Sequence, residues 1–366
     1  MNAGNGADGA RPLLTLTDVV KHFPVRQSLV QRRGASVRAV DGVSLSVAEG
    51  ETLGIVGETG CGKSTLARCA SRLYPLTSGR IEFDGQDITG LSRHQLRTVR
   101  RNVQMVFQDP FSSLNPRRRV GSIIADPLVI HGTVARAELR KRVQELMELV
   151  GLNPEHYNRF PADFSGGQRQ RIGIARALGL QPKLLICDEP VSALDVSIQA
   201  QIINLLADLQ DELRLTYVFI AHDLSVVEHV SDRVAVMYLG KIVEVGQAER
   251  LYAAPRHPYT AALLSAAWIP DPDQATAREQ IVLSGEVPSP VDPPSGCRFH
   301  TRCPWAQPRC AAEEPPLLPA PDAAAHLTAC HFPLAAGALG PAPTSASPGG
   351  RPPQTPPGNS LNRSAP

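Results

Sequence analysis

Residues 52–70 read TLGIVGETGCGKSTLARCA, and this stretch decides the fold. It is an apolar strand-like run, a glycine-rich loop and a helix-like run in direct succession. Between a strand and a helix, glycines let backbone N–H groups curl around a phosphate, and the N-terminus of the new helix faces its negative charge. The stretch therefore predicts a nucleotide-phosphate site, which we expect to comprise Gly57, Gly60, Cys61, Gly62, Lys63, Ser64 and Thr65.

Two side chains of this loop have distinct expected roles. The spacing of the motif places Lys63 to reach the β- and γ-phosphates of ATP and Ser64 to ligate Mg²⁺. A glycine-rich turn without a ligand is the alternative. The position of the loop after a strand and before a helix favours the phosphate site.

A second acidic element follows in KLLICDEP, residues 183–190. An apolar strand-like run ends there in Asp188, which is placed to hold the Mg²⁺ ion and its water shell. With Asp188 on the metal, Glu189 is left to orient or deprotonate the attacking water as a general base. The alternative is a solvated acidic strand end. In this setting we expect ATP hydrolysis, with Mg²⁺ as cofactor.

The surrounding chain predicts an α/β fold of the P-loop NTPase type. Apolar strand-like runs alternate with helix-like segments, which is typical of a mostly parallel sheet. The strand-like runs are residues 53–56, 103–107, 184–187, 217–221 and 234–238. Residues 111–164 interrupt this pattern with helical periodicity, as in LRKRVQELMELVGL, so we expect an α-helical insertion there, reaching about residue 167.

A third element is FSGGQRQRIGIARAL, residues 164–178. Three small residues that open a helix, Ser165, Gly166 and Gly167, form another anion-binding terminus, and we expect Gln168 to belong to the same site. With this motif the sequence resembles the ABC-type ATPases, whose signature it matches except that Phe164 stands in place of the usual leucine. The resemblance implies that the signature of one subunit covers ATP held by the P-loop of another, so that a dimer contains two composite sites.

The remaining elements of the resembled family occur in the same order. Gln108 in VFQDP resembles the Q-loop glutamine, which senses Mg²⁺ and the γ-phosphate, and Asp195 ends a D-loop-like SALD segment. His222 in FIAHD resembles the switch histidine, a hydrogen-bond partner of the γ-phosphate. Phe23 occupies the position of the aromatic ring that stacks on adenine, with ordinary core packing as its alternative.

Three longer stretches resemble the dipeptide and oligopeptide importer ATPases, in particular the second of their two ATPase types. They are FQDPFSSLNPRRRVG, PRHPYTAALLSAAWIPDP and GCRFHTRCPWAQPRC…CHF, and the similarity spans about residues 13–334. The resemblance implies a second, related ATPase subunit, two transmembrane permeases and an extracytoplasmic substrate-binding protein as partners. Peptide is the default cargo, while close relatives move nickel, sugars or opine-like solutes.

Four of the seven cysteines crowd into the last quarter as Cys297-x5-Cys303-x6-Cys310-x19-Cys330. Four soft thiolates suit an iron–sulfur cluster or Zn²⁺. The spacing does not match the common C-x2-C zinc patterns, and the resemblance implies a [4Fe–4S] cluster, with Zn²⁺ as the alternative. His300, His326 or His331 could replace one ligand. Free buried thiols in a domain held by packing alone are the other possibility.

Composition limits the remaining possibilities. Charged residues nearly balance, at a net +2, so no electrostatic drive toward nucleic acid is expected. The N-terminus has no secretory signal pattern and no run of 18 or more apolar residues occurs, so we expect a peripheral protein on the cytoplasmic face of the membrane. A soluble ABC protein of DNA repair or translation would need two cassettes or a long insertion, whereas this sequence has one cassette and a short helical insertion. A regulatory partner without enzymatic activity would lack a catalytic element, whereas all of the expected elements are present in this sequence.

The expected organisation has four parts. A flexible N-terminus (1–12) precedes the ATPase domain (13–253), a small cysteine-containing domain follows (254–334), and a Pro-rich tail (335–366) is expected to be disordered.

Overall fold

The computed structural model describes residues 11–25, 35–109, 113–266, 281–320 and 323–335. The segments predicted to be flexible or disordered, 1–12 and 335–366, lie almost wholly outside the described residues. The strands are β1 (Pro12–Pro24), β2 (Ser36–Ala48), β3 (Thr52–Val56), β4 (Ser78–Phe83), β5 (Gln86–Asp87), β6 (Val103–Val106), β7 (Leu184–Asp188), β8 (Thr216–Ile220), β9 (Arg233–Tyr238), β10 (Lys241–Gln247), β11 (Leu318–Ala320) and β12 (Ala323–Thr328). The helices are α1 (Lys63–Ala70), α2 (Leu96–Asn102), α4 (Val120–His131), α5 (Leu139–Leu149), α6 (Gly166–Leu178), α7 (Val196–Leu213), α8 (Leu224–Val230), α9 (Ala248–Ala253), α10 (Pro258–Ala266) and α12 (Pro308–Ala312), with 3₁₀ turns η1 (Pro154–Asn158) and η2 (Pro161–Asp163).

The larger sheet has the strand order β11-β12-β10-β9-β3-β8-β7-β6. Its part from β9 to β6 is parallel, as the sequence predicts, and each of the five strand-like runs forms one of these strands. Strands β3, β7 and β8 are buried at every residue. A parallel strand covered on both faces needs apolar residues throughout, which explains why these runs do not alternate.

A second, antiparallel sheet has the order β2-β1-β4-β5. Apolar residues of its strands, such as Leu14 and Val47, share one core with Leu53 of β3 and with Leu66 of α1. Helix α1 is therefore packed between the two sheets. This arrangement fixes the loop that precedes α1, because both the strand before it and the helix after it are buried.

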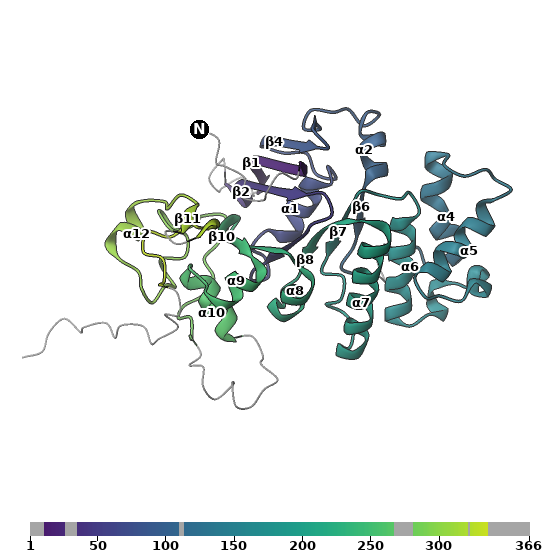
Figure 1. Cartoon of the computed structure of the whole chain (residues 1–366). Helices are drawn as coiled ribbons and strands as arrows, with labels where there is room; N and C mark the ends of the chain where they lie inside the picture. The colour runs from purple at the N-terminus through teal and green to yellow at the C-terminus, as the bar shows by residue number, and fades with distance from the viewer. Residues whose placement is uncertain (1–10, 26–34, 110–112, 267–280, 321–322, 336–366) are drawn as a thin grey trace, which may run out of the picture.

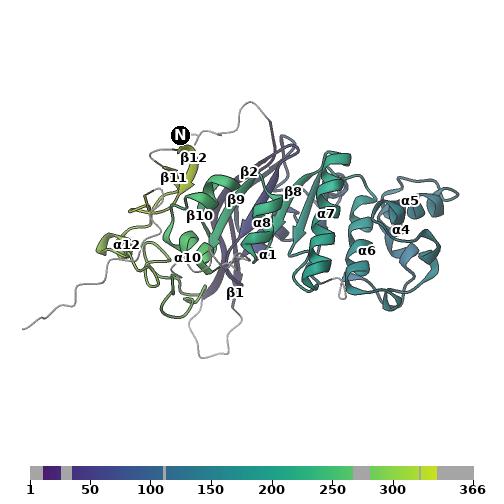
Figure 2. The same cartoon turned by 60° about the horizontal axis from the view of Figure 1, so that its bottom comes forward.

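The insertion after β6 is helical, as its periodicity predicts. Helix α4 contacts α5, α6 and η1, and the residues 139–149 that set the helical pattern form α5. Figures 1 and 2 show α4, α5 and α6 at one end of the molecule and the C-terminal elements at the other end.

The expected separate cysteine-containing domain over 254–334 is not supported. Strand β12 pairs with β10 and so extends the larger sheet. Phe299 is buried in the same core as strands of the larger sheet and contacts Tyr238 of β9. The C-terminal segment is attached along the edge of the larger sheet, because apolar residues such as Phe299 are buried in the core of that sheet.

Candidate functional site

The predicted phosphate loop connects β3 to α1 and curves around the ammonium group of Lys63. Nζ of Lys63 donates hydrogen bonds to the carbonyls of Gly57, at 2.7 Å, and Glu58, at 3.1 Å, and lies 3.9 Å from the sulfur of Cys61. The side chain of Lys63 is buried although it is charged. A buried cation needs partners, and a phosphate is a stronger partner than a neutral carbonyl.

Two glycines of this loop are required by both conformation and space. Gly57 and Gly62 have φ angles of 153° and 113°. A Cβ at Gly57 would lie 2.1 Å from the carbonyl oxygen of Met237, and one at Gly62 would lie 2.0 Å from that of Ala39. The backbones of β9 and β2 therefore lie directly against the loop at these two glycines. Gly60 has a φ of 81° and nothing within 4 Å of its added Cβ, so at Gly60 conformation alone favours glycine.

Ser64 and Asp188 lie together at the expected Mg²⁺ position. Oγ of Ser64 donates a 2.7 Å hydrogen bond to Oδ1 of Asp188 at the end of β7. Burial raises the pKa of Asp188, and the hydrogen bond from Ser64 opposes that rise. Two adjacent oxygen donors of this kind suit a hard divalent cation, so the residues present fit Mg²⁺. Thr65 follows in the first turn of α1 and is half-buried.

Glu189 lies between Gln108 and His222. Its Oε2 accepts a 2.6 Å hydrogen bond from Nε2 of Gln108 and lies 3.7 Å from Nδ1 of His222. Glu189 has a φ of 46°, which is uncommon for a residue other than glycine and is typical of functional positions. A cavity of about 30 Å³, lined in part by Glu189, Ser192 and His222, has room for a water molecule. The arrangement can orient and deprotonate a water at the edge of the sheet.

The predicted signature begins α6 and is held by a capping box. Oγ of Ser165 accepts the backbone N–H of Gln168 at 3.3 Å, and Oε1 of Gln168 accepts the N–H of Ser165 at 3.0 Å. A Cβ at Gly167 would lie 2.5 Å from Cγ2 of Ile198 in α7, and one at Gly166 would lie 3.2 Å from Leu194. The signature therefore packs against the SALD segment, whose Asp195 is the exposed N-cap of α7.

Helix α6, which carries the signature, belongs to the helical end of the molecule, whereas the phosphate loop leads into α1 between the two sheets (Figure 1). The structure therefore brings Lys63, Ser64 and Asp188 into one group and Gln108, Glu189 and His222 into another, both at the carboxyl ends of the parallel strands. It does not bring the signature of this chain onto its own phosphate loop.

Phe23 lies at the end of β1 and is half-buried. It pairs across the sheet with Val37, two residues before Ala39, whose carbonyl touches Gly62. Its ring meets Tyr74 edge-on at 5.7 Å, and Nζ of Lys21 lies 4.9 Å from its centroid. The ring is in an aromatic contact, and both expected roles of Phe23 stay predictions.

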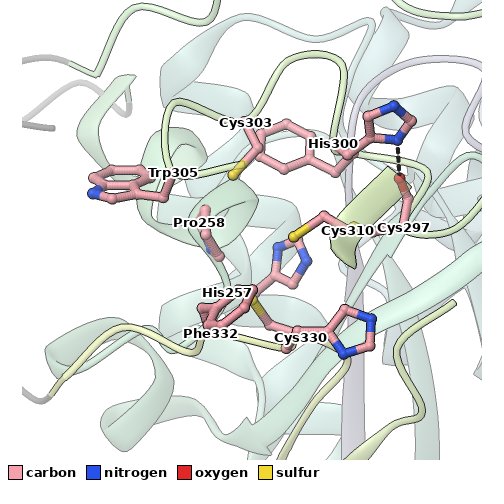
Figure 3. Close-up of a pocket in the computed structure, with 11 residues that line it drawn as sticks. His257, Pro258, Cys297, His300, Cys303, Trp305, Cys310, Cys330 and Phe332 are labelled. Atoms are coloured by element: carbon pink, nitrogen blue, oxygen red, sulfur yellow. Dashed lines mark hydrogen bonds between the residues drawn. The ribbon is translucent and has the colours of Figure 1, made fainter. Parts of the chain in front are cut away.

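The four C-terminal cysteines line one cavity. Figure 3 shows Cys303, Cys310 and Cys330 around it together with Pro258 and Trp305, and Cys297 also contributes to the wall. Burial raises the pKa of the Cys303 and Cys330 thiols to about 12 and raises that of Cys297. These thiols are therefore protonated at neutral pH unless a cation is bound, because metal binding requires thiolates.

The cavity meets only part of what an iron–sulfur cluster requires. The donor chemistry fits, but the free volume of about 20 Å³ is room for a single water, so a cluster would require the cysteines to move apart. Among the described residues, no three His, Cys, Asp or Glu side chains are arranged to hold a metal ion. The structure therefore does not support the predicted [4Fe–4S] site, nor the Zn²⁺ alternative.

The three histidines considered as substitute ligands all have other partners. Nδ1 of His300 lies 2.8 Å from the carbonyl of Cys297 (Figure 3), and Nε2 of His331 lies 3.0 Å from that of Glu313. His326 does not line the cavity; its Nε2 lies 2.6 Å from the buried carboxylate of Glu244. His300 and His331 do line the cavity, as does a further histidine, His257, whose pKa burial lowers to about 4.

Sequence reasoning missed the residues that hold the phosphate loop from the C-terminal side. Arg302 and Tyr259 both bond to Glu58, the residue after Gly57. Neither lies near the loop in sequence, and neither belongs to a motif whose chemistry points to it. The signal that could have found Tyr259 and Arg302 is only their presence in the two C-terminal stretches that carry the family resemblance.

Fold and site together define a P-loop ATPase in which an α-helical insertion carries a second anion-binding helix terminus. Residues 40–192 match the ABC transporter family, and residues 243–310 match the oligopeptide/dipeptide transporter C-terminal region. The chain belongs to the ATP-binding proteins of ABC transporters and carries the C-terminal region of the oligopeptide/dipeptide group. It is an ATPase coupled to transport.

The similarity to curated relatives extends over nearly the whole length of those relatives. The chain is 58% identical over 321 residues to the oligopeptide transport ATP-binding protein AppF of Bacillus subtilis, covering 87% of this chain and 97% of that protein. It is 53% identical over 313 residues to the oligopeptide transport ATP-binding protein OppF of Escherichia coli, covering 85% and 94%. Among solved structures, the dimeric ATP-binding cassette MJ0796 bound to ADP and Pi is similar with a TM-score of 0.57 at 29% identity, covering 64% of this chain and 98% of that one.

Proposed function

We propose that this protein is the ATP-hydrolysing subunit of an importer that takes up dipeptides and oligopeptides. The observation that carries the proposal is the C-terminal region of the oligopeptide/dipeptide transporter group, joined to an ATPase site. In that site Ser64 is hydrogen-bonded to Asp188, and Gln108 is hydrogen-bonded to Glu189. Relatives over 50% identical along nearly their whole length are named for peptide transport, which supports peptide as the cargo.

The proposed site divides the chemistry among two groups of side chains. Lys63 binds the β- and γ-phosphates, and Ser64 and Asp188 hold Mg²⁺, with Gln108 as a further contact. Glu189 acts as general base on the attacking water, and His222 hydrogen-bonds the γ-phosphate. Mg²⁺ supplies charge neutralisation at the phosphates when bound. Support comes from the 2.7 Å Ser64–Asp188 and 2.6 Å Gln108–Glu189 contacts.

The proposed functional unit is a dimer of ATPase subunits with two composite sites. Ser165 to Gln168 of one chain would cover the nucleotide that Lys63 of the other chain holds, with Asp195 at the interface. The separation of α6 from α1 within one chain supports this division, as does the similarity to a cassette solved as a dimer. Whether the second subunit is a related chain or an identical one decides whether the two sites are equivalent.

In the proposed cycle, ATP binding draws the two subunits together and hydrolysis separates them. Closure moves the helical insertion, and with it the permease helices docked near Gln108. The ligand shifts a population between open and closed dimers because it binds the closed state more tightly. Membrane attachment would be through the permeases; among the described residues, no helix is long and apolar enough to cross a membrane.

The test combines uptake and partner identification. A strain that lacks this chain is complemented with the wild type or with Lys63→Ala, and uptake of labelled di- and tetrapeptides is compared with uptake of nickel and of sugars. We expect Lys63→Ala to abolish peptide uptake only, and two permeases and a second ATPase to co-purify with the tagged protein. Loss of nickel or sugar uptake with intact peptide uptake would assign another solute, and co-purification with ribosomes or DNA would contradict a transport role.

For the four cysteines we propose metal binding, with a [4Fe–4S] cluster ahead of Zn²⁺. The four sulfur donors that line one cavity support it, and the cysteines would have to move apart to admit a cluster. Iron, acid-labile sulfide and zinc are measured on anaerobically purified wild type and on a Cys303→Ser variant, with Cys69→Ser as the matched control at a buried cysteine in α1. Zinc alone in the wild type would exclude the cluster, and metal retained in full by Cys303→Ser would exclude the site.

A further inference from the structure

Glu58 of the phosphate loop is held by two residues that lie more than 200 positions further along the chain. Nη1 of Arg302 donates hydrogen bonds of 3.1 and 2.9 Å to the two carboxylate oxygens of Glu58. The backbone N–H of Glu58 donates a 2.8 Å hydrogen bond to the hydroxyl of Tyr259 in α10. We call Arg302 and Tyr259, together with the groups of Glu58 that they bind, the Glu58 clamp.

The remaining backbone group of Glu58 acts inside the phosphate loop. Its carbonyl accepts hydrogen bonds from Nζ of Lys63, at 3.1 Å, and from the N–H of Cys61, at 3.2 Å. Glu58 is therefore the point where the C-terminal segment and the phosphate-binding lysine meet. Because Gly57, directly before Glu58, and Gly60, two residues after it, offer no side chains to hold the loop, an external contact has a direct effect on the loop conformation.

Tyr259 of the clamp belongs to a cluster of three packed aromatic rings. The rings of Tyr238, Tyr259 and Phe299 lie 4.7 to 5.3 Å apart, and all three are fully buried. The N–H of Arg302 donates to the carbonyl of Phe299 at 3.0 Å, so the turn that carries the guanidinium is itself fixed. A positioning contact needs such support, since a loosely held arginine would not constrain the loop.

The ion pair of the clamp is shielded from water. The side chain of Arg302 is 9% exposed and that of Glu58 is 24% exposed. Burial alone would lower the pKa of Arg302, but its hydrogen bonds to Glu58 raise that pKa above the usual value. A partly buried pair that loses one member leaves the other charge without a partner, which costs more than an exposed pair.

We propose that the C-terminal segment is a part of the nucleotide site, in which Arg302 and Tyr259 are positioning residues for the phosphate loop. They act through Glu58 on the backbone that surrounds Lys63 and touch neither the phosphates nor the reacting water. The segment that carries Arg302 runs between Cys297 and Cys303, so the clamp also connects the cysteine cavity to the phosphate loop. The inference rests on the proposed role of this loop in binding ATP.

The test compares nucleotide affinity with catalytic turnover in the full-length protein. Variants Arg302→Gln, Tyr259→Phe and Glu58→Gln are measured for binding of a fluorescent ATP analogue and for KM and kcat of ATP hydrolysis. We expect affinity to fall by roughly 5- to 50-fold and KM to rise in parallel, with kcat near that of the wild type, because Glu189, Gln108 and His222 are untouched. Arg302→Lys, which keeps the charge, should recover part of the affinity.

Arg309→Gln is the matched control, because Arg309 forms an exposed ion pair with Glu313 in the same C-terminal segment, at 2.9 Å. It should leave KM and kcat unchanged. The double variant Glu58→Gln/Arg302→Gln should be no weaker than either single variant, since both remove the same interaction. Additive losses, or Arg302→Gln and Tyr259→Phe variants that lose thermal stability with unchanged KM, would overturn the positioning role.

Lys63→Ala separates this inference from the proposed site itself. If Lys63→Ala binds ATP as the wild type does, the phosphate loop is wrongly assigned. If Lys63→Ala loses ATP while the clamp variants bind normally, only the positioning role is wrong.

Discussion

Nε2 of Gln108 donates a 2.6 Å hydrogen bond to Oε2 of Glu189 across the ends of two neighbouring parallel strands. Gln108 follows β6 and Glu189 follows β7, and these strands pair directly. Carboxyl ends of adjacent parallel strands meet at one edge of a sheet, where ligands of α/β proteins bind. The pair therefore connects the segment that leads into the helical insertion with the proposed general base.

Replacing Glu189 with glutamine tests the general-base role. A carboxamide keeps an oxygen that can accept the hydrogen bond from Gln108 but cannot take a proton. We expect ATP binding to persist and hydrolysis to fall by about 10²- to 10⁴-fold, with ATP-dependent dimers accumulating. Phosphate release, nucleotide binding and size-exclusion chromatography with ATP measure these effects.

The control is Glu212→Gln on the exposed face of α7, which should hydrolyse ATP as the wild type does. Near-normal hydrolysis by Glu189→Gln would mean that another group activates the water.

Removing the hydroxyl of Ser165 tests the composite site. Ser165→Ala loses the capping-box contact with Gln168 and should cost about 1 kcal/mol of stability. If the signature covers a nucleotide on the other subunit, ATP binding to the isolated chain should be unchanged, whereas ATP-driven dimerisation and hydrolysis should be lost. Equilibrium binding at low protein concentration and phosphate release at high concentration separate the two effects.

Asn153→Ala provides a matched loss of an N-cap. Its side chain accepts the N–H of Glu155 at 2.9 Å at the start of η1, so a similar cost in stability is expected there. Hydrolysis by Asn153→Ala should stay normal. If Ser165→Ala weakens ATP binding to the isolated chain instead, the signature serves the nucleotide of its own subunit.

The parts of the fold that could be predicted are those coded locally. The strand, loop and helix around Lys63 occur in one continuous stretch, and the helical periodicity of 139–149 is visible without any partner. The acidic pair Asp188 and Glu189 could be placed because it ends an apolar run that is buried on both faces. In each case the residues that determine the structure are neighbours in sequence.

The parts that could not be predicted depend on pairing between distant segments. β1 and β2 pair with several register shifts, and such bulges disturb the two-residue alternation by which strands are recognised. The pairing of β12 with β10 and the Glu58–Arg302 contact join residues far apart in sequence, so no local pattern contains them. For the same reason, the sequence gives no sign that the expected C-terminal domain extends the larger sheet through β12.

Gly62→Ala tests whether packing by β2 determines the phosphate loop. A methyl group at Gly62 meets the carbonyl of Ala39 and also requires a φ of 113°, so the loop or the strand has to move. We expect loss of ATP binding and a destabilisation larger than the about 1 to 2 kcal/mol that left-handed backbone strain costs. Isothermal titration with ATP and urea unfolding measure both quantities.

Gly132→Ala is the comparison, since Gly132 has a φ of 64° at the C-cap of α4 and open space around its added Cβ. It should cost only the strain and leave ATP binding intact. Equal destabilisation by the two substitutions would show that the contact with Ala39 is not decisive.

Asp41→Asn tests how the C-terminal segment is attached to β2, and its effect depends on pH. The carboxylate of Asp41 accepts a hydrogen bond from Nη2 of Arg298, which is 7% exposed, and Nε2 of His22 lies 2.9 Å from it. Burial would raise the pKa of Asp41, but the hydrogen bonds from Arg298 and His22, with the charges of Arg298 and Lys241, lower that pKa below its usual value. An acid whose folded pKa is lowered stabilises the protein fully above its unfolded pKa and loses that stabilisation as the pH falls through the folded pKa.

At pH 7, Asp41→Asn should therefore reduce the free energy of unfolding by about 1 to 3 kcal/mol, because Arg298 is left buried without its counter-charge. The difference between wild type and variant should shrink as the pH falls below the usual aspartate pKa of about 3.9 and on through the lowered pKa of the folded protein. Urea unfolding midpoints measured from pH 7 to pH 3 follow the difference, with the exposed Asp211→Asn on α7 as the control that should match the wild type throughout. A gap that stays constant over this range would mean that Asp41 contributes through its shape or its neutral hydrogen bonds and not through its charge.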